Sequence, residues 1–219
     1  MQLYDKLLGL PLFQGMSSSD LQEVVTRVKI GFLKYRRNET IIKAGDKCQR
    51  LLFLLDGQMD MTTTAANHSF TVTEQLTAPS LIEPERVFGL TQHYARTYTT
   101  RSLCHMLSIG KDDVIHLTSE FMVFRLNLIN ILSTQSQRHQ RNLWLHSPEN
   151  IHDRVVRFLR DHCATPSGQK VFHIKMQQLA HEINASRLEV SNVLNALDSK
   201  NIITLQRGMI TINNLIDLK

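Results

Sequence analysis

The stretch that decides the fold is Met176–Leu197, which reads MQQLAHEINASRLEVSNVLNAL. Its apolar residues recur at helical spacing before and after Asn184, where the pattern is interrupted. Asparagine is one of the few residues other than glycine that accept the left-handed backbone of a tight turn between helices. Ser186 and Glu189 then form the pattern of a capping box, so a second helix is predicted to begin at about Arg187. The stretch therefore predicts a helix-turn-helix.

The outward face of the second predicted helix begins with side chains suited to reading a DNA groove. Arginine matches the two acceptors of guanine, and asparagine matches adenine. Because a recognition helix places its N-terminal residues at base edges, we expect DNA contacts from its first turns. The expected residues are Ser186, Arg187, Leu188, Ser191, Asn192 and Asn195. The apolar pattern alone would also serve an ordinary helical hairpin. DNA binding is favoured by five features together: the small Ala180, the turn at Asn184, the Ser186 cap, the polar outer face and the local positive charge.

Two short apolar runs follow this helix. Ile202–Leu205 and Met209–Ile212 are separated by a turn, which predicts a hairpin with Arg207 at its tip. A helix-turn-helix followed by such a hairpin is a winged helix, and Arg207 joins the expected DNA contacts. This C-terminal domain is expected to span residues 146–219.

Residues 1–110 are expected to form a separate domain of short strands after a helical beginning. The apolar run Leu51–Leu55 stops at Asp56 and Gly57, as in a strand that is buried on both faces. Many short strands with frequent turns indicate a barrel or a sandwich. With helices on either side of these strands, the chain is predicted to be of the α+β class.

Residues 111–145 are expected to form a long helix and a hinge. Apolar residues are spaced mostly three and four apart, at Val114, Leu117, Phe121, Phe124, Leu128, Ile131 and Leu132. Such a stripe must be covered, either by the chain's own barrel or by the same helix of a second copy. A narrow seam is typical of coiled coils and favours pairing of the helix around residues 113–136 with a second copy.

The charge of the chain is positive and uneven. Of the 219 residues, 42% are hydrophobic and 21% are charged, and the formal net charge is +5. Residues 138–219 carry 11 basic and 7 acidic side chains, whereas the rest of the chain carries 14 and 13. A basic C-terminal part suits a polyanionic partner, although a solvated surface often has a similar charge.

Several classes of protein are disfavoured. No apolar run approaches the ~20 residues that span a bilayer, so we expect no membrane segment. Cys48, Cys104 and Cys163 are far apart and lack metal-binding spacing, so we expect reduced cysteines, a cytoplasmic location and no metal. No Ser/His/Asp constellation and no phosphate-binding Gly loop is evident, so we expect no catalytic residues and no enzyme.

Three motifs resemble those of the CRP/FNR family of bacterial transcription regulators, and the resemblance covers nearly the whole chain. Leu12–Gly15 resembles the family's opening, Ala44–Asp46 followed by Leu52–Gly57 resembles its first strands, and Ala185–Ser191 resembles its recognition helix. The resemblance implies a β-roll sensor like a cyclic-nucleotide-binding jelly roll, then a dimerisation helix, then a winged helix. This order is the one deduced from the residues.

The resemblance carries over to the recognition helix with two changes. Arg187 matches the family directly, but Leu188 stands where a Glu is usual and Asn192 where a second Arg is usual. Leu188 suits a thymine methyl group and Asn192 suits adenine, so the target sequence should differ from the common family site. Lys175 and Gln177 stand where phosphate contacts are expected.

The sensor departs further from the family. Members that bind cyclic AMP carry Gly-Glu, followed farther along by Arg-Ser or Arg-Thr. Here Ile82 precedes Glu83 and removes the space that a glycine leaves for a ligand, while Arg96 and Thr97 follow at an altered distance. Glu83, Arg96 and Thr97 are therefore the candidate effector-binding residues, but Glu83 and Arg96 suit an ion pair equally well. A cyclic nucleotide is disfavoured, and another small ligand or none is favoured.

The complete interpretation is a homodimeric transcription regulator that binds a partly palindromic double-stranded DNA site. Two winged helices would reach successive major grooves about 34 Å apart, and an effector in the β-roll would shift their pose. The loop Thr165–Gln169 resembles the family surface that contacts RNA polymerase, although an ordinary exposed turn explains its sequence equally well. The alternative is a small-ligand-binding module that acts on a protein partner without binding DNA.

Overall fold

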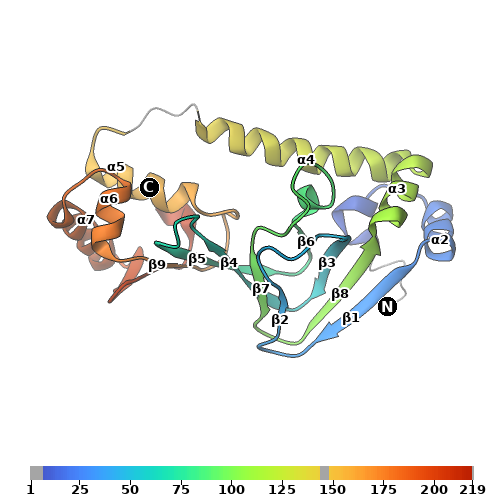
Figure 1. Ribbon diagram of the computed structural model, residues 1–219, viewed down its shortest axis with the longest axis horizontal. Helices are drawn as coiled ribbons and strands as arrows, with labels where there is room; N and C mark the ends of the chain where they lie inside the picture. The colour runs from blue at the N-terminus through green and yellow to red at the C-terminus, as the bar shows by residue number, and fades with distance from the viewer. Residues whose placement is uncertain (1–6, 144–147, 219) are drawn as a thin grey trace. The chain divides into compact units, whose positions relative to one another are not determined.

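The computed structural model describes residues 7–143 and 148–218, which form two compact units (Figure 1). One unit comprises Met1–Met59 and Thr77–Leu143, and the other comprises Asp60–Leu76 and Trp144–Lys219. The C-terminal unit is therefore assembled from two separate segments of the chain. The boundary expected at residues 145 and 146 lies outside the described residues.

The N-terminal unit is built around antiparallel strands, with helices at both ends of its sequence. Four strands form one sheet in the order β1-β8-β3-β6, and β2 pairs with β7. The elements are η1 (Pro11–Phe13), α2 (Ser18–Arg27), β1 (Ile30–Tyr35), β2 (Thr40–Ile42), β3 (Arg50–Asp56), β6 (Ser80–Ile82), η2 (Pro84–Arg86), β7 (Thr97–Thr100), β8 (Cys104–Gly110), α3 (Lys111–Glu120) and α4 (Met122–Leu143). The predicted strand at Leu51–Leu55 is confirmed as part of β3, and its first four residues are buried.

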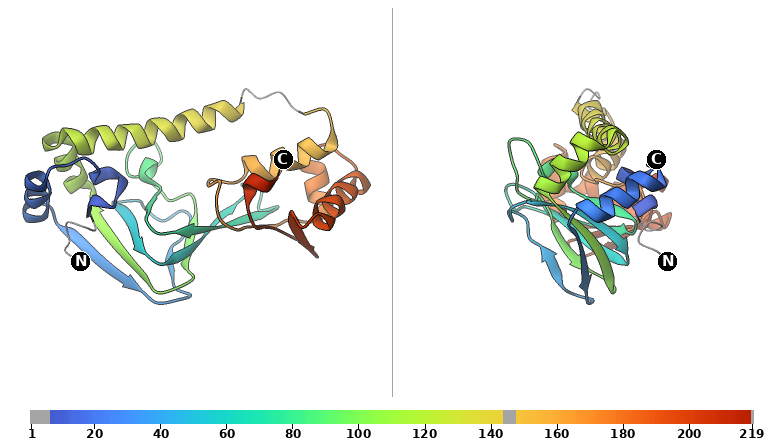
Figure 2. Two further views of the ribbon diagram at one scale, coloured as in Figure 1. Left: turned by 180° about the vertical axis from the view of Figure 1, so that it is seen from behind. Right: turned by 90° about the vertical axis from the view of Figure 1, so that its right-hand side faces the viewer.

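The helical stripe after residue 110 packs inside its own unit. The side chains of Val114, Leu117, Phe121, Phe124 and Leu128 are buried there, and the ring of Phe124 lies 5.3 Å from that of Phe13 in η1. Figure 2 shows η1 close to the first part of α4. The expectation that this stripe forms the seam with a second copy is therefore wrong for these five residues, because the chain's own core covers them, whereas Ile131 and Leu132 are half-buried.

The predicted single helix is also divided in two. Phe121 has φ −110° and ψ 102°, which is extended backbone, and it separates α3 from α4. Across the break, the side-chain amide of Asn127 donates to the carbonyl oxygens of Leu12 and Gln14, at 3.2 and 2.9 Å. The bend at Phe121 and these bonds fix the first turns of α4 against the N-terminal segment.

The C-terminal unit contains a three-helix core and a sheet of β10-β11-β9-β5, with β4 beside β5. The elements are β4 (Gln58–Thr64) and β5 (Thr71–Thr77), which begin and end at the unit boundary, and α5 (Ile151–Asp161), β9 (Lys170–His173), α6 (Met176–Glu182), α7 (Arg187–Ser199), β10 (Ile203–Gln206), β11 (Met209–Ile212) and η3 (Leu215–Asp217). Its core joins Val155, Leu159, Leu179, Val190 and Leu194 of the helices with Phe172 and Ile210 of the strands. The predicted helix-turn-helix and hairpin are both confirmed.

Candidate nucleic-acid interface

The turn between α6 and α7 has the conformation that the sequence predicts. Asn184 has φ +52°, in the left-handed region, and its N–H donates to the carbonyl oxygen of His181 at 3.2 Å. The N–H of Ala185 donates to the carbonyl oxygen of Ala180 at 2.9 Å. These bonds satisfy the end of α6 and redirect the chain within a few residues.

The second helix begins with the predicted capping box. The N–H of Glu189 donates to the Ser186 hydroxyl at 3.2 Å, and the N–H of Ser186 donates to the Glu189 carboxylate at 2.9 Å. Hydrogen bonds from Ser186 hold the pKa of the Glu189 carboxyl below its usual range. Two donors at the helix N-terminus are thereby satisfied, and α7 begins at Arg187 as predicted.

The two faces of α7 differ sharply. Val190, Leu194 and Leu197 are buried in the core of the unit. The expected DNA-binding residues on the other face are nearly all exposed, and only Ser191 is half-buried. The exposed residues are Ser186, Arg187, Leu188, Asn192 and Asn195. Leu188 is 71% exposed, which is unusual for a leucine and leaves its side chain free for contact with a partner. The Asn195 amide donates to the Ser191 hydroxyl at 3.4 Å.

The flanks of α7 present further basic and polar groups. Arg207 is exposed in the turn between β10 and β11, next to Gly208, whose φ of +73° allows the tight reversal. Lys175 is exposed at the N-cap of α6, and Gln177 is exposed in its first turn. The N–H of Ile174 donates to the carbonyl oxygen of Gly208 at 3.0 Å, which ties the hairpin turn to the start of α6.

Arg154 of α5 contributes to this site but was not identified from the sequence. Its Nη1 atom donates to the carbonyl oxygens of Ile183 and Asn184, at 3.1 and 3.0 Å. The guanidinium therefore satisfies the carbonyl groups at the turn and holds α6 and α7 against α5. In the sequence, the one hint of this role is that Arg154 lies among the apolar residues of a helix. That position does not identify its hydrogen-bond partner Asn184, which is 30 positions away.

Two of the candidate effector residues of the N-terminal unit, Glu83 and Arg96, belong to an internal cluster around the Glu83 carboxylate. The Glu83 carboxylate is buried and accepts from the N–H of Ala95 at 2.7 Å and from the Tyr98 hydroxyl at 3.0 Å. The guanidinium groups of Arg86 and Arg96 lie 3.9 and 3.8 Å from it. Burial and the nearby Glu83 carboxylate raise the pKa of Tyr98 above its usual range.

The cluster brings together two of the three candidate effector residues. Thr97 lies apart, because its hydroxyl accepts from the N–H of Ala44 at 3.1 Å. Ile82 and the aromatic Tyr98 are both buried beside the ion pair. Arg96 therefore lies next to the internal carboxylate of Glu83. A ligand phosphate was the other partner that the sequence allowed for Arg96.

Two family models match the chain in succession. A cyclic nucleotide-binding domain matches residues 32–121, and a Crp-like helix-turn-helix domain matches residues 153–219. The chain belongs to the CRP/FNR family of transcription regulators. This membership makes it a DNA-binding transcription regulator, and the alternative of a module that does not bind DNA is not favoured.

Solved structures of CRP/FNR regulators share the fold. The catabolite activator protein of Thermus thermophilus is 22% identical, with a TM-score of 0.54, and the match covers 95% of this chain and 96% of that one. The sensor domain of the transcriptional regulator DNR from Pseudomonas aeruginosa is 16% identical, with a TM-score of 0.53, covering 67% of this chain and 93% of that one. Among curated proteins, no sequence matches significantly. No helix within the described residues is long and apolar enough to cross a membrane.

Proposed function

We propose that this CRP/FNR regulator binds a partly palindromic duplex as a homodimer, with α7 of each copy in the major groove. The observation that carries the proposal is the exposed polar face at the N-terminus of α7, which begins with Arg187. Arg187 suits bidentate pairing with guanine, and Asn192, five residues later, suits adenine. Lys175, Gln177 and Arg207 flank this face and suit the phosphate backbone.

A second face of α4 supports the homodimer. Met122, Leu126 and Ile129 are 63%, 50% and 50% exposed, and they lie four and three residues apart. This spacing places them on one stripe of the helix, next to the buried stripe that packs into the unit's own core. Three large apolar side chains in a row on an exposed helix are typical of a coiled-coil seam. The second copy of α4 is the partner that we propose for them.

The remaining parts of the proposal concern regulation and location. Because Glu83 already pairs with Arg86 and Arg96, a ligand phosphate would have to break that pair, and we assign no cyclic nucleotide to the β-roll. We also propose that the loop Thr165–Gln169 contacts RNA polymerase, because Pro166, Ser167 and Gly168 are exposed there. A regulator of this kind acts on the chromosome, hence in the cytoplasm, and carries out no reaction of its own.

Two variants test the DNA interface. The site is first selected from random duplexes with the full-length protein. Arg187→Ala should weaken binding to that site by about 1–3 kcal/mol and relax the preference at one base pair of each half-site. Lys175→Ala should instead weaken binding to all sequences alike. The slope of log K against log salt concentration should become smaller by about one, as for the loss of one phosphate contact.

Three outcomes contradict the proposal. The selection fails to enrich any duplex, Arg187→Ala leaves both affinity and preference unchanged, or the two variants behave alike. The first of these would favour a regulatory module that acts on another protein. Lys200→Met, at an exposed position near the far end of α7, removes one positive charge and serves as the control for charge alone.

A further inference from the structure

The hairpin formed by β4 and β5 is built into the DNA-binding unit. Strand β5 pairs antiparallel with β9, with Thr71 opposite His173 and Glu74 opposite Lys170. Phe70 and Val72 are buried in the same core as α5 and α7, and the ring of Phe70 lies 5.4 Å from that of Phe158. The cyclic nucleotide-binding model spans residues 32–121 and so includes this hairpin, yet Asp60–Leu76 falls in the C-terminal unit.

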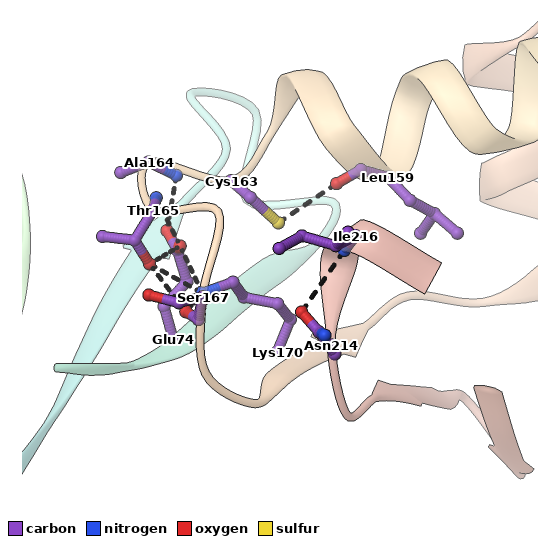
Figure 3. Close-up of polar contacts among 9 residues, drawn as sticks. All are labelled: Glu74, Leu159, Cys163, Ala164, Thr165, Ser167, Lys170, Asn214 and Ile216. Carbon is purple, nitrogen blue, oxygen red and sulfur yellow. Dashed lines mark hydrogen bonds and ion pairs between the residues drawn. The ribbon is translucent and has the colours of Figure 1, made fainter. Parts of the chain in front are cut away.

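A buried ion pair joins β5 of the hairpin to the first residue of β9 (Figure 3). The Lys170 ammonium lies 3.2 Å from the Glu74 carboxylate, and the two side chains are 0% and 1% exposed. The ammonium also donates to the Thr165 hydroxyl at 2.6 Å and to the Ser167 carbonyl oxygen at 2.7 Å. Three acceptors thus match the three N–H bonds of the ammonium.

The carboxylate is equally well satisfied. Glu74 accepts from the N–H of Ala164 at 2.8 Å, and from the N–H and the hydroxyl of Thr165 at 3.0 Å each. Figure 3 shows Ala164 and Thr165, in the loop after α5, beside Glu74 and Lys170. With Lys170 included, the carboxylate meets four donors, so both charges are compensated without solvent.

The loop itself is shaped by the hairpin. The N–H of Gln75 donates to the carbonyl oxygen of Gln169 at 3.1 Å. Gly168 has φ +81°, and a Cβ atom placed on it would lie 3.2 Å from the carbonyl oxygen of Gln75. The loop therefore approaches the hairpin backbone so closely that a larger residue at position 168 would be strained. Pairing of the strands and folding of the loop depend on each other.

Full burial makes separation of this ion pair costly. If the hairpin left β9 while the loop kept its fold, Lys170 would remain buried without a counter-charge, which is a far more costly state than either the intact pair or a neutral pair. Separation that leaves the loop in place is therefore unfavourable.

We propose that Asp60–Leu76 is an integral part of the DNA-binding unit and that Glu74 and Lys170 form the latch that keeps it there. In the closed state the hairpin and the winged helix move as one body. Any reorientation of the DNA-binding unit then carries this hairpin with it. The proposal stands on contacts within the C-terminal unit and does not depend on which DNA sequence is bound.

Amide hydrogen exchange of the full-length protein tests the latch. Glu74→Gln keeps the shape and an acceptor but leaves Lys170 without a counter-charge. It should raise the exchange rates of Gln75, Ala164 and Thr165, and of the β5–β9 ladder, at least tenfold. Exchange in the sheet of β1, β8 and β3 should not change. Glu149→Gln, at an exposed position of the same unit, is the matched control.

The double variant Glu74→Gln, Lys170→Met decides between a latch and a merely stabilising contact. It removes both charges, so the exchange rates should return most of the way to those of the wild type. If Glu74→Gln alone fails to fold, a double variant that folds supports the latch in the same way as recovered exchange rates. Unchanged exchange in Glu74→Gln, or a double variant that recovers nothing, overturns the proposal.

A second measurement tests whether the hairpin belongs to the DNA-binding unit. As denaturant is added in small steps, the β5 amides should come to exchange together with those of α7, because they share one cooperative unit. If the β5 amides instead exchange together with those of β3 and β8, the hairpin belongs to the sensor and the proposal is wrong.

Discussion

The guanidinium of Arg154 donates a hydrogen bond to the backbone carbonyl oxygen of Asn184, 3.0 Å away, at the turn of the helix-turn-helix. A second bond from the same nitrogen reaches Ile183. Because Asn184 is the residue with a left-handed backbone, Arg154 stabilises the one conformation that sets the direction of α7. The recognition helix is thus positioned by a residue that lies outside the helix-turn-helix itself.

Replacement of Arg154 should therefore weaken DNA binding as well as stability. We expect Arg154→Met, which keeps the apolar part of the side chain, to lower the free energy of unfolding by about 2 kcal/mol, as for the loss of charge-assisted hydrogen bonds. Specific affinity should fall further than non-specific affinity, because the angle of α7 is less well fixed. Chemical denaturation and binding to specific and random duplexes measure these effects. Arg154→Lys should recover part of each, and equal losses on both duplexes would show that Arg154 acts on stability alone.

The helix-turn-helix could be predicted from the sequence because its signals are local. Asn184, Ser186 and Glu189 lie within six residues of one another, and each has a specific backbone role that the structure confirms. The wing was predictable for the same reason, since its turn at Gly208 and its alternating strands are adjacent in the chain.

The features that escaped prediction depend on contacts between distant residues. Periodicity showed that Leu128 and Phe124 lie on one face of a helix, but it did not show whether the barrel or a second copy covers that face. Ala164 and Glu74 are hydrogen-bonded although they lie 90 residues apart, so no local pattern assigns the β4–β5 hairpin to the DNA-binding unit. In the sensor, Glu83 and Arg96 suited both an ion pair and a ligand site, and no local pattern indicates the buried partners that Glu83 has in the structure.

The exposed stripe of α4 leads to a prediction about oligomeric state. Ile129→Asp places a charge at the centre of the proposed seam, where it would be buried without a partner in the dimer. We expect the variant to be a folded monomer at concentrations where the wild type is a dimer, and to bind a palindromic site much more weakly. Sedimentation equilibrium and duplex binding measure the two effects.

Thr134→Asp provides the matched control for this prediction. Thr134 is exposed on α4 but lies on the flank of the stripe that contains Leu126 and Ile129. The Thr134→Asp variant should therefore remain a dimer. If Ile129→Asp also remains dimeric, the exposed stripe of α4 is not the seam.

The changed residues of the recognition helix predict a change of specificity. Leu188 and Asn192 are both exposed on the outer face of α7, at the places where family members usually carry Glu and Arg. The double variant Leu188→Glu, Asn192→Arg should therefore prefer base pairs that Glu and Arg read, cytosine and guanine, at the corresponding positions. Each mismatched base pair should cost about 1–3 kcal/mol, measured by selection from random duplexes. An unchanged preference would mean that these two side chains do not contact bases.

The capping box predicts a pH dependence of stability with a defined sign. The pKa of Glu189 is lowered by hydrogen bonds from Ser186, so its carboxylate form is favoured in the folded state. A group of this kind contributes stability above its unfolded pKa, and the contribution is lost as the pH falls through the folded pKa. Glu189→Gln keeps the acceptor of a capping box but does not titrate. The wild type should therefore be more stable than Glu189→Gln near neutral pH, and the difference should vanish in acid below the usual range of a glutamate. Thermal or denaturant unfolding across this pH range tests the sign, and a difference that grows as the pH falls would contradict it.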